Sequence, residues 1–221
     1  MPEHGTRVML RQHRTSRAIR SVFRDGREII KEYRRLSWPG DLRRRWKREH
    51  QALLRLSQRG VLAPRTFGYE SPERGLILHR REFIAGERLQ TIEDIPGHEF
   101  AAHVAAIHRA GVTNGDASLD NLLLTDRRQI LFIDYGRASV FLVRGPLFYF
   151  HVGKELARIR RRLFAHSLAR WRMFLADYRR CSTYPAWGWA VTASALSYWL
   201  RRWGLASSAD GAEWSADQQT C

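Results

Sequence analysis

Short apolar runs separated by turn residues alternate along the chain with stretches in which apolar positions recur at helical spacing. Residues 21–24 and 27–33 flank Asp25-Gly26, a dipeptide that favours a tight hairpin. Runs at residues 76–78 and 82–84 predict further strands. The pattern predicts both strands and helices, and therefore an α+β fold.

A helix expected over residues 40–60, from Gly40-Asp41 to a closing Gly60, carries a carboxylate on its apolar stripe. Glu49 occupies the one place in the stripe that an apolar residue does not. Because a buried carboxylate is costly without a partner, we expect it to pair with Lys31, on the second strand of the first hairpin. Alternatively, Glu49 lies at the edge of the stripe and reaches solvent. The stripe residues are Leu42, Trp46, Leu53 and Leu56.

A second hairpin is predicted where two apolar runs, residues 122–124 and 130–133, flank a polar turn at residues 125–128. Asp116 and Asn121 precede its first strand with the D-x-x-x-x-N spacing of a phosphotransferase catalytic loop, and Asp134 follows its second strand. Carboxylate and amide oxygens are hard ligands suited to Mg²⁺, and Asp116 could accept the proton of an attacking hydroxyl. Taken singly, these residues could be turn formers or a strand cap. Their order and spacing favour phosphoryl transfer.

The charge of the chain indicates a polyanionic partner. Its 221 residues carry a formal net charge of +16, which favours attraction to nucleic acid, an anionic membrane face or a phosphate-rich substrate.

The N-terminal residues lack the apolar core of a signal peptide, and no stretch has the roughly 18 apolar residues of a spanning helix. Cys181 and Cys221 fit neither a disulfide framework nor a zinc site. We therefore expect a cytoplasmic protein that can bind a membrane surface.

After Gly136 the apolar pattern predicts that the chain reaches a helix starting near Val152, which extends over residues 154–180, and a further helix over residues 186–205. An earlier helix is expected over residues 98–110, closed by Gly111, with His103 and His108 as packing or hydrogen-bonding residues. The last two helices are rich in Trp and Arg, which fits either a core-facing surface or a surface at lipid headgroups. Residues 207–221 are expected to be disordered.

These segments together resemble the small bacterial lipopolysaccharide kinases, which phosphorylate Kdo or heptose and belong to the protein-kinase-like superfamily. The resemblance covers roughly residues 22–156. It rests on four segments: IIKEY, KREHQALLRLSQRGVLAP, HRAGVTNGDASLDNLLL and ILFIDYGRA.

The resemblance implies a two-lobed kinase-like fold, with an N-lobe at residues 1–84 and an abbreviated C-lobe at residues 85–206, and the use of ATP and Mg²⁺. It implies that Lys31 contacts the phosphates and pairs with Glu49, that Asp116 is the catalytic aspartate, and that Asn121 and Asp134 hold Mg²⁺. Residues 83–86 would form the hinge that binds adenine. The acceptor would be a lipid-linked saccharide at an anionic membrane.

Two departures from the kinase pattern leave room for a weakened or inactive enzyme. No G-x-G-x-x-G precedes the first hairpin; the covering loop would fall at residues 14–20 and be built on Thr15, Ser16 and Arg side chains, or nucleotide binding would be weak. Asn114-Gly115 stands where relatives have a histidine before the aspartate, so Asn114 would support the loop with its amide. The absence of an A-P-E triplet disfavours a protein substrate.

The alternatives are a minimal kinase associated with tRNA modification, another atypical Ser/Thr-type kinase, or a kinase-like scaffold without activity that binds anionic lipid or nucleic acid. A kinase for cationic aminoglycosides is disfavoured by the positive charge.

Overall fold

The computed structural model describes residues 7–14, 18–35, 42–91, 93–95 and 97–205, and the architecture is α+β, as predicted. The strands are β1 (Val8–Arg14), β2 (Ala18–Asp25), β3 (Glu28–Arg35), β4 (Thr66–Glu70), β5 (Leu76–Glu82), β6 (Glu87–Arg88), β7 (Val112–Thr113), β8 (Leu122–Leu124), β9 (Ile130–Phe132) and β10 (Ser139–Val140). The helices are α1 (Leu42–Gln58), α2 (Gly97–Arg109), α3 (Pro146–Leu163), α4 (Leu168–Cys181) and α5 (Ala186–Arg202), with a 3₁₀ turn η1 (Leu119–Asn121).

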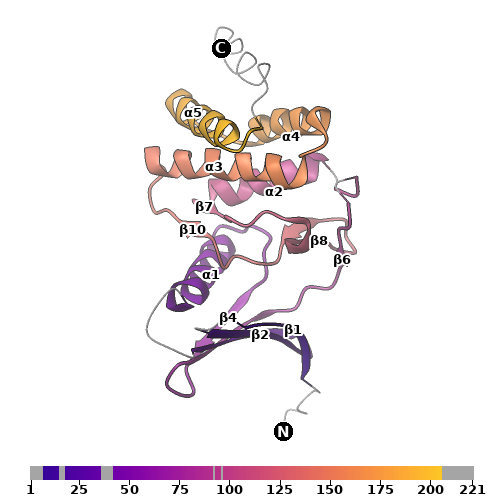
Figure 1. Cartoon of the computed structure of the whole chain (residues 1–221), viewed down its shortest axis with the longest axis vertical. Helices are drawn as coiled ribbons and strands as arrows, with labels where there is room; N and C mark the ends of the chain where they lie inside the picture. The colour runs from indigo at the N-terminus through magenta and orange to yellow at the C-terminus, as the bar shows by residue number, and fades with distance from the viewer. Residues whose placement is uncertain (1–6, 15–17, 36–41, 92, 96, 206–221) are drawn as a thin grey trace.

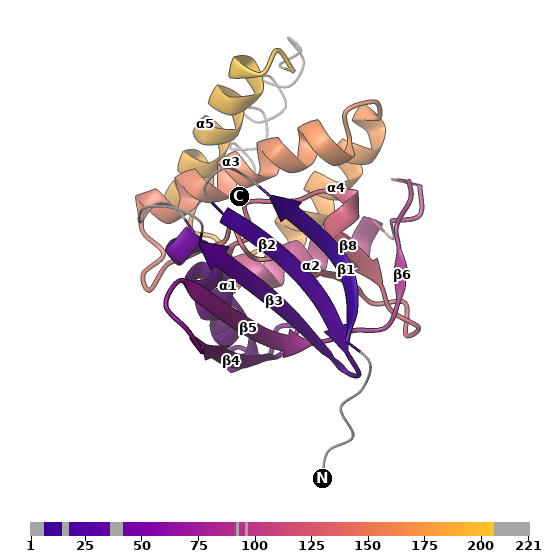
Figure 2. The same ribbon diagram turned by 60° about the horizontal axis from the view of Figure 1, so that its bottom comes forward.

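The larger sheet has five antiparallel strands in the order β1-β2-β3-β5-β4, and α1 lies behind it in the view of Figure 2. The first predicted hairpin is confirmed as β2 and β3, which pair from Ala18↔Arg35 to Asp25↔Glu28. Gly26 has a φ of +55° at the turn, a backbone conformation that glycine adopts without steric cost. This hairpin carries Lys31 on the strand at the middle of the sheet.

Helix α1 presents the predicted apolar stripe to the interior. Trp46, Leu53 and Leu56 are buried, and so is Glu49 between them. The helix ends as the sequence predicted, since Gly60 has a φ of +65° and Val61 donates its N–H to the carbonyl of Leu56 at 3.0 Å. The candidate N-cap Asp41 lies outside the described residues.

The helical part lies at the opposite end of the molecule from the larger sheet, with α1 and the short strands between the two (Figure 1). Two small sheets, β6-β8-β9 and β10-β7, connect these parts, and β8 and β9 form the second predicted hairpin. One hydrophobic core runs from α1 through α2 and β8–β9 to α3, α4 and α5. This arrangement is consistent with a small two-lobed fold, whereas the lobe boundary at residues 84 and 85 stays a prediction.

Two helix predictions are wrong at their ends. Helix α3 begins at Pro146, after the N-cap Gly145, so the run at residues 147–150 belongs to it rather than preceding a helix near Val152. The single helix predicted over residues 154–180 is two helices, because the chain leaves α3 at Phe164 and starts α4 with Ser167 as N-cap. The hydroxyl of Ser167 accepts from the N–H of Arg170 at 3.4 Å, which favours a new helix start there.

The strand predictions also need two corrections. Residues 82–84 form no strand of their own: Glu82 ends β5, and residues 83–86 connect it to β6. Strand β1 was not predicted, because all its residues are exposed and an edge strand without a buried face has no apolar alternation.

The tail at residues 207–221 lies outside the described residues. Within the described part of the chain, none of the helices has the length and apolar character that crossing a bilayer requires.

Candidate functional site

The ammonium of Lys31 and the carboxylate of Glu49 form a buried ion pair between β3 and α1. Their Nζ and Oε1 atoms are 2.6 Å apart, and the side chains are 2% and 0% exposed. Burial lowers the pKa of Lys31, and the carboxylates of Asp134 and Glu49 only partly offset this. Burial alone would raise the pKa of Glu49, but the Lys31 ammonium outweighs it and the pKa lies below its usual value. The structure thus brings together the two residues expected to pair.

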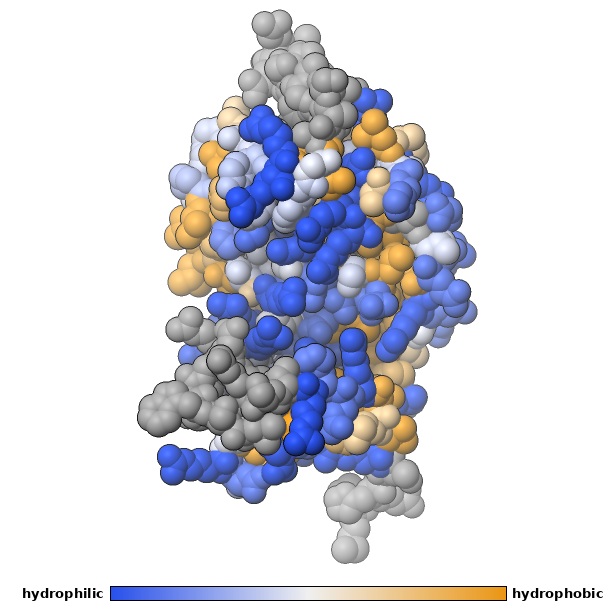
Figure 3. All heavy atoms as spheres, in the orientation of Figure 1, coloured by the Kyte–Doolittle hydropathy of each residue, from blue (hydrophilic) through white to orange (hydrophobic). Residues whose placement is uncertain are grey.

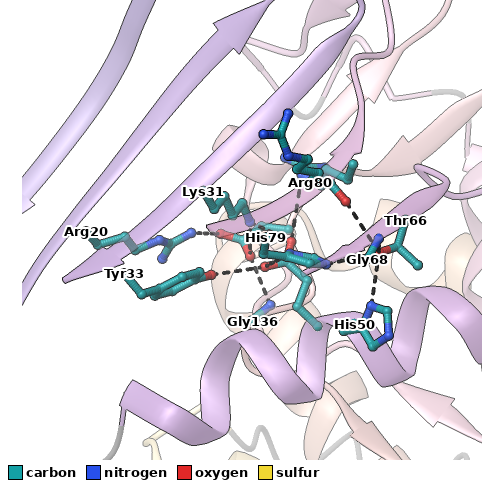
Figure 4. Close-up of polar contacts among 12 residues, drawn as sticks. Arg20, Lys31, Tyr33, His50, Thr66, Gly68, His79, Arg80 and Gly136 are labelled. Carbon is teal, nitrogen blue, oxygen red and sulfur yellow. Dashed lines mark hydrogen bonds and ion pairs between the residues drawn. The ribbon is translucent and has the colours of Figure 1, made fainter. Parts of the chain in front are cut away.

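Further polar groups from the sheet surround Glu49. The hydroxyl of Tyr33 donates to Oε2 at 3.3 Å, the ring of His79 lies 3.9 Å from the same atom, and Nε of Arg81 lies 3.8 Å from Oε1. In Figure 4, Tyr33, Lys31 and His79 converge from neighbouring strands above α1. Because both carboxylate oxygens face donors, Glu49 holds Lys31 in a fixed position.

Asp134 follows β9 and accepts hydrogen bonds on both of its carboxylate oxygens. Oδ1 lies 3.1 Å from Nζ of Lys31 and 2.9 Å from the backbone N of Gly136, and Oδ2 lies 2.9 Å from the guanidinium of Arg20. Burial would raise the pKa of Asp134, but Lys31, Arg20 and the Gly136 N–H together hold it well below the usual range. Asp134 is therefore an anion at neutral pH, and one of its two cations, Arg20, was not predicted from the sequence.

Asp116 and Asn121 lie on the loop that enters β8. The Nδ2 group of Asn121 donates to the backbone carbonyl of Asp116 at 3.0 Å, and the backbone carbonyl of Asn121 accepts from Ile133 N at 2.9 Å. The first bond closes the loop over η1, and the second fixes it to the residue before Asp134. Since Nδ2 is the donor, Oδ1 of Asn121 is the atom that could ligate a cation.

Helix α3 supports this loop, a contribution that the sequence patterns did not indicate. Arg162 lies 2.6 Å from Oδ1 of Asp116, and Arg137, which follows Gly136, lies 3.7 Å from Oδ2. Arg158 donates to the carbonyl of Gly115, whose N–H donates to Glu155 at 3.4 Å. The helical position of Glu155, Arg158 and Arg162 was predicted, but their direction towards the loop depends on how α3 packs.

The expected role of Asn114 is not supported. Its side chain is fully buried, but neither its Nδ2 nor its Oδ1 atom has a hydrogen-bond partner among the described residues. The loop is held by Glu155 and Arg158 instead. The prediction was wrong because the amide of Asn114 makes no hydrogen bond to the loop among the described residues.

Side chains from both parts of the molecule line a cavity of about 430 Å³. Lys31, Asn121 and Asp134 lie on its wall, whereas Asp116 is joined to it through Asn121. Apolar side chains form part of the wall, and so do three residues of the connection between β5 and β6 that was predicted as a hinge. The apolar residues include Val22, Ile29, Leu123 and Ile133, and the connection contributes Phe83, Ile84 and Gly86.

The donor set of the cavity fits a magnesium ion that is shared with a phosphate ligand. One carboxylate, Asp134, and one amide oxygen, Asn121, are the hard ligands such an ion takes from the protein when phosphates and water complete its shell. The described residues contain no cluster of three or more His, Cys, Asp or Glu that could hold a metal by itself. Asp134 and Asn121 are thus the candidate oxygen ligands that the cavity offers.

His103 and His108 of α2 have structural roles, as predicted. Nδ1 of His108 lies 2.6 Å from the hydroxyl of Tyr178, and its Nε2 lies 3.5 Å from Glu155. His103 is buried against Phe132, with 5.9 Å between the ring centroids. His108 therefore links α2 to α4 and to the glutamate that supports the loop.

No protein family and no curated protein matches the sequence. Among solved structures, the chain is similar to a bifunctional kinase-methyltransferase, WbdD, with 15% identity and a TM-score of 0.45, over 80% of this chain and 47% of that one. A second structure of WbdD has 13% identity and a TM-score of 0.45, over 85% of this chain and 50% of the other. The chain spans about half the length of these proteins.

Proposed function

We propose that the chain is an ATP- and Mg²⁺-dependent kinase that transfers the γ-phosphate to a sugar hydroxyl of lipopolysaccharide core or a related lipid-linked saccharide. The observation that carries the proposal is the meeting of Lys31, Asn121 and Asp134 on one cavity, with Glu49 behind the lysine. These residues come from distant parts of the chain and are the types that bind phosphates and a divalent cation.

In the proposed reaction each group has one task. Lys31, fixed by Glu49, binds the phosphates, and Asp134 and Asn121 hold the magnesium ion, which neutralises charge on the transferring phosphoryl group. The apolar part of the cavity and the backbone of residues 83–86 bind the adenine. Asp116 orients the acceptor hydroxyl and accepts its proton.

The proposal of a saccharide acceptor rests on the sequence resemblance and on the charge. Residues 135–145 are all that separate Asp134 from α3, which leaves little chain for docking a peptide. The net charge of +16 suits a phosphorylated acceptor at an anionic membrane. Binding of the protein to anionic vesicles should therefore weaken as salt is added, because screening acts on surface charge; binding that ignores lipid charge contradicts the membrane part of the proposal.

The test is a transfer panel with labelled ATP and three acceptors: lipopolysaccharide core, tRNA and a mixed peptide library. Label should appear on the core saccharide. Asp134→Ala should abolish transfer, whereas Asp126→Ala, on the exposed turn of the β8–β9 hairpin, should leave it unchanged.

Three outcomes contradict the proposal in different ways. Label on tRNA favours a kinase of tRNA modification, and Mg-ATP binding without transfer to any acceptor favours a nucleotide-binding scaffold. Equal loss of transfer in Asp134→Ala and Asp126→Ala places the metal elsewhere.

A further inference from the structure

The guanidinium of Arg20 occupies one side of the carboxylate that would hold the metal. Its Nη2 atom is 2.9 Å from Oδ2 of Asp134, while Lys31 is 3.1 Å from Oδ1 of the same group. Arg20 lines the cavity, and 26% of its side chain is exposed, so a ligand in the cavity can reach it. Figure 4 shows Arg20 and Lys31 approaching the same point from two strands. The two residues therefore share one anion.

The strand register places Arg20 on the cavity face of the sheet. Arg20 pairs with Tyr33 and Val22 pairs with Lys31 across β2 and β3. Paired residues point to the same face, and so do residues two apart on one strand. Arg20 is thus a diagonal neighbour of Lys31 on that face, and its position is fixed by the hairpin rather than by a loop.

The chemistry of Arg20 suits the phosphate groups of a nucleotide. In kinases with a glycine-rich loop, that loop covers the phosphates, whereas this chain has no glycine between residues 6 and 25. A guanidinium offers several N–H donors in a plane and binds phosphate oxygens in pairs. The Nε atom of Arg20 is buried and has no hydrogen-bond partner in the described part of the chain, so it has a donor to spare.

Electrostatic interactions favour a change of partner for Arg20 when Mg-ATP binds. A magnesium ion at Asp134 would repel both cations that now contact this carboxylate, and a triphosphate would offer them new anionic oxygens. Lys31 retains Glu49 as a second partner at 2.6 Å, whereas Asp134 is the only carboxylate within ion-pair distance of Arg20 among the described residues. Arg20 is therefore the cation that is freer to move.

We propose that Arg20 is a phosphate-binding residue that replaces the missing glycine-rich loop. It holds Asp134 while no nucleotide is bound and moves its guanidinium to the β- and γ-phosphates when Mg-ATP enters. The inference rests on the proposed function, because it assigns a ligand to the same cavity. It adds a second cation to the one that the sequence motif supplies.

The experiment measures nucleotide affinity by calorimetry on the full chain, with Mg-ATP, Mg-ADP and adenosine as separate probes. Arg20→Ala should weaken Mg-ATP binding by roughly ten- to a hundredfold, the effect of losing a charge-assisted hydrogen bond, and Mg-ADP binding by less. Adenosine affinity should not change. Arg20→Lys should recover part of the loss. Arg34→Ala, an exposed arginine on β3 outside the cavity, is the matched control and should bind all three probes normally.

Two different results overturn two different claims. If Arg20→Ala binds Mg-ATP as tightly as the unchanged chain, or more tightly, Arg20 is only a counter-ion of Asp134 and the inference fails. If the unchanged chain binds no Mg-ATP, the proposed function fails. Circular dichroism without nucleotide checks the fold of each variant. Should Arg20→Ala not fold, Arg20→Gln, which keeps most of the side-chain length, decides by the same criterion.

Discussion

The guanidinium of Arg162, in the last turn of α3, lies 2.6 Å from the carboxylate of Asp116. Both side chains are partly exposed, at 32% and 24%, so the pair should contribute less than about 1 kcal/mol to stability. Its effect is therefore expected on the orientation of Asp116, the proposed base, rather than on folding.

Arg162→Ala should lower kcat by roughly ten- to a hundredfold, because a poorly oriented base loses the alignment that phosphoryl transfer needs. The Mg-ATP affinity should stay the same, and Arg162→Lys should recover part of the rate. Transfer kinetics on the acceptor identified by the panel, together with calorimetry, provide the measurement. Arg59→Ala, an exposed arginine beyond the end of α1, is the control. A parallel loss of Mg-ATP affinity would instead assign Arg162 to the nucleotide.

Removing one member of the Lys31–Glu49 pair should cost far more stability than removing both. Lys31→Met leaves Glu49 fully buried without its nearest cation and should lower the free energy of unfolding by about 3–5 kcal/mol. Lys31→Met with Glu49→Leu should recover most of this while nucleotide binding stays lost. Urea unfolding followed by circular dichroism measures the cycle. No recovery in the double variant would mean that Tyr33, His79 and Arg81 need the carboxylate as well.

This ion pair also shows how far the sequence could be interpreted. A carboxylate on an apolar helix stripe needs a buried cation, and the chain has few lysines on predicted strands, so Lys31 and Glu49 could be paired before the fold was known. Asn121 and Asp134 were indicated by their spacing around the β8–β9 hairpin. In each case the sequence pattern asks for one type of residue at one position, so that a single candidate stands out.

Arg20 and Arg162 could not be singled out in the same way. The chain is rich in arginine, and the sequence alone does not distinguish an arginine of the site from one on the solvated surface. Only the β2–β3 register and the packing of α3 select them. The end of α3 was missed for a related reason: apolar spacing continues from α3 into α4, and the one signal of the break was Ser167.

Stability should fall as the pH is lowered from about 6.5 towards 4. Burial lowers the pKa of His103 to about 4, against a usual 6.5. In this window the unfolded chain binds a proton that the folded chain does not. The contribution of the neutral His103 to the free energy of unfolding is therefore fully present above pH 6.5 and is lost as the pH falls, by on the order of 3 kcal/mol. Burial lowers the pKa of His79 to about 4 as well, which adds to the slope.

His103→Leu should make that slope shallower, because the leucine side chain keeps an apolar contact with Phe132 and binds no proton. Urea unfolding at several pH values measures it. The carboxylates Glu49 and Asp134, whose pKa values are depressed from the usual 4.5 and 3.8, begin to lose their contributions at about pH 5, so the slopes are compared between about pH 6.5 and 5. His98→Leu, an exposed histidine on the same helix, is the control. An unchanged slope in His103→Leu contradicts the assignment.

Gly153 sets the distance between α3 and α5. We expect its replacement to destabilise the protein and to alter the candidate site. A Cβ atom there would lie 2.7 Å from Cβ of Ala195 and 2.9 Å from the backbone N of Leu196, and both distances are shorter than a van der Waals contact. Gly153→Ala should therefore lower the free energy of unfolding by about 1–3 kcal/mol, although alanine favours a helix. Gly97→Ala, which meets no atom within 4 Å, should not destabilise the protein.

The same substitution tests whether α5 matters to the loop. Glu155, Arg158 and Arg162 follow Gly153 on α3 and contact residues 115 and 116, so a shift of α3 away from α5 should move them. We expect Gly153→Ala to lower kcat even where the protein is fully folded, with little change in Mg-ATP affinity, because the residues proposed to bind the nucleotide lie on β2 and β3, between β5 and β6, and around β8–β9. If kcat stays normal while stability falls, α5 supports the core alone and α3 holds the loop without it.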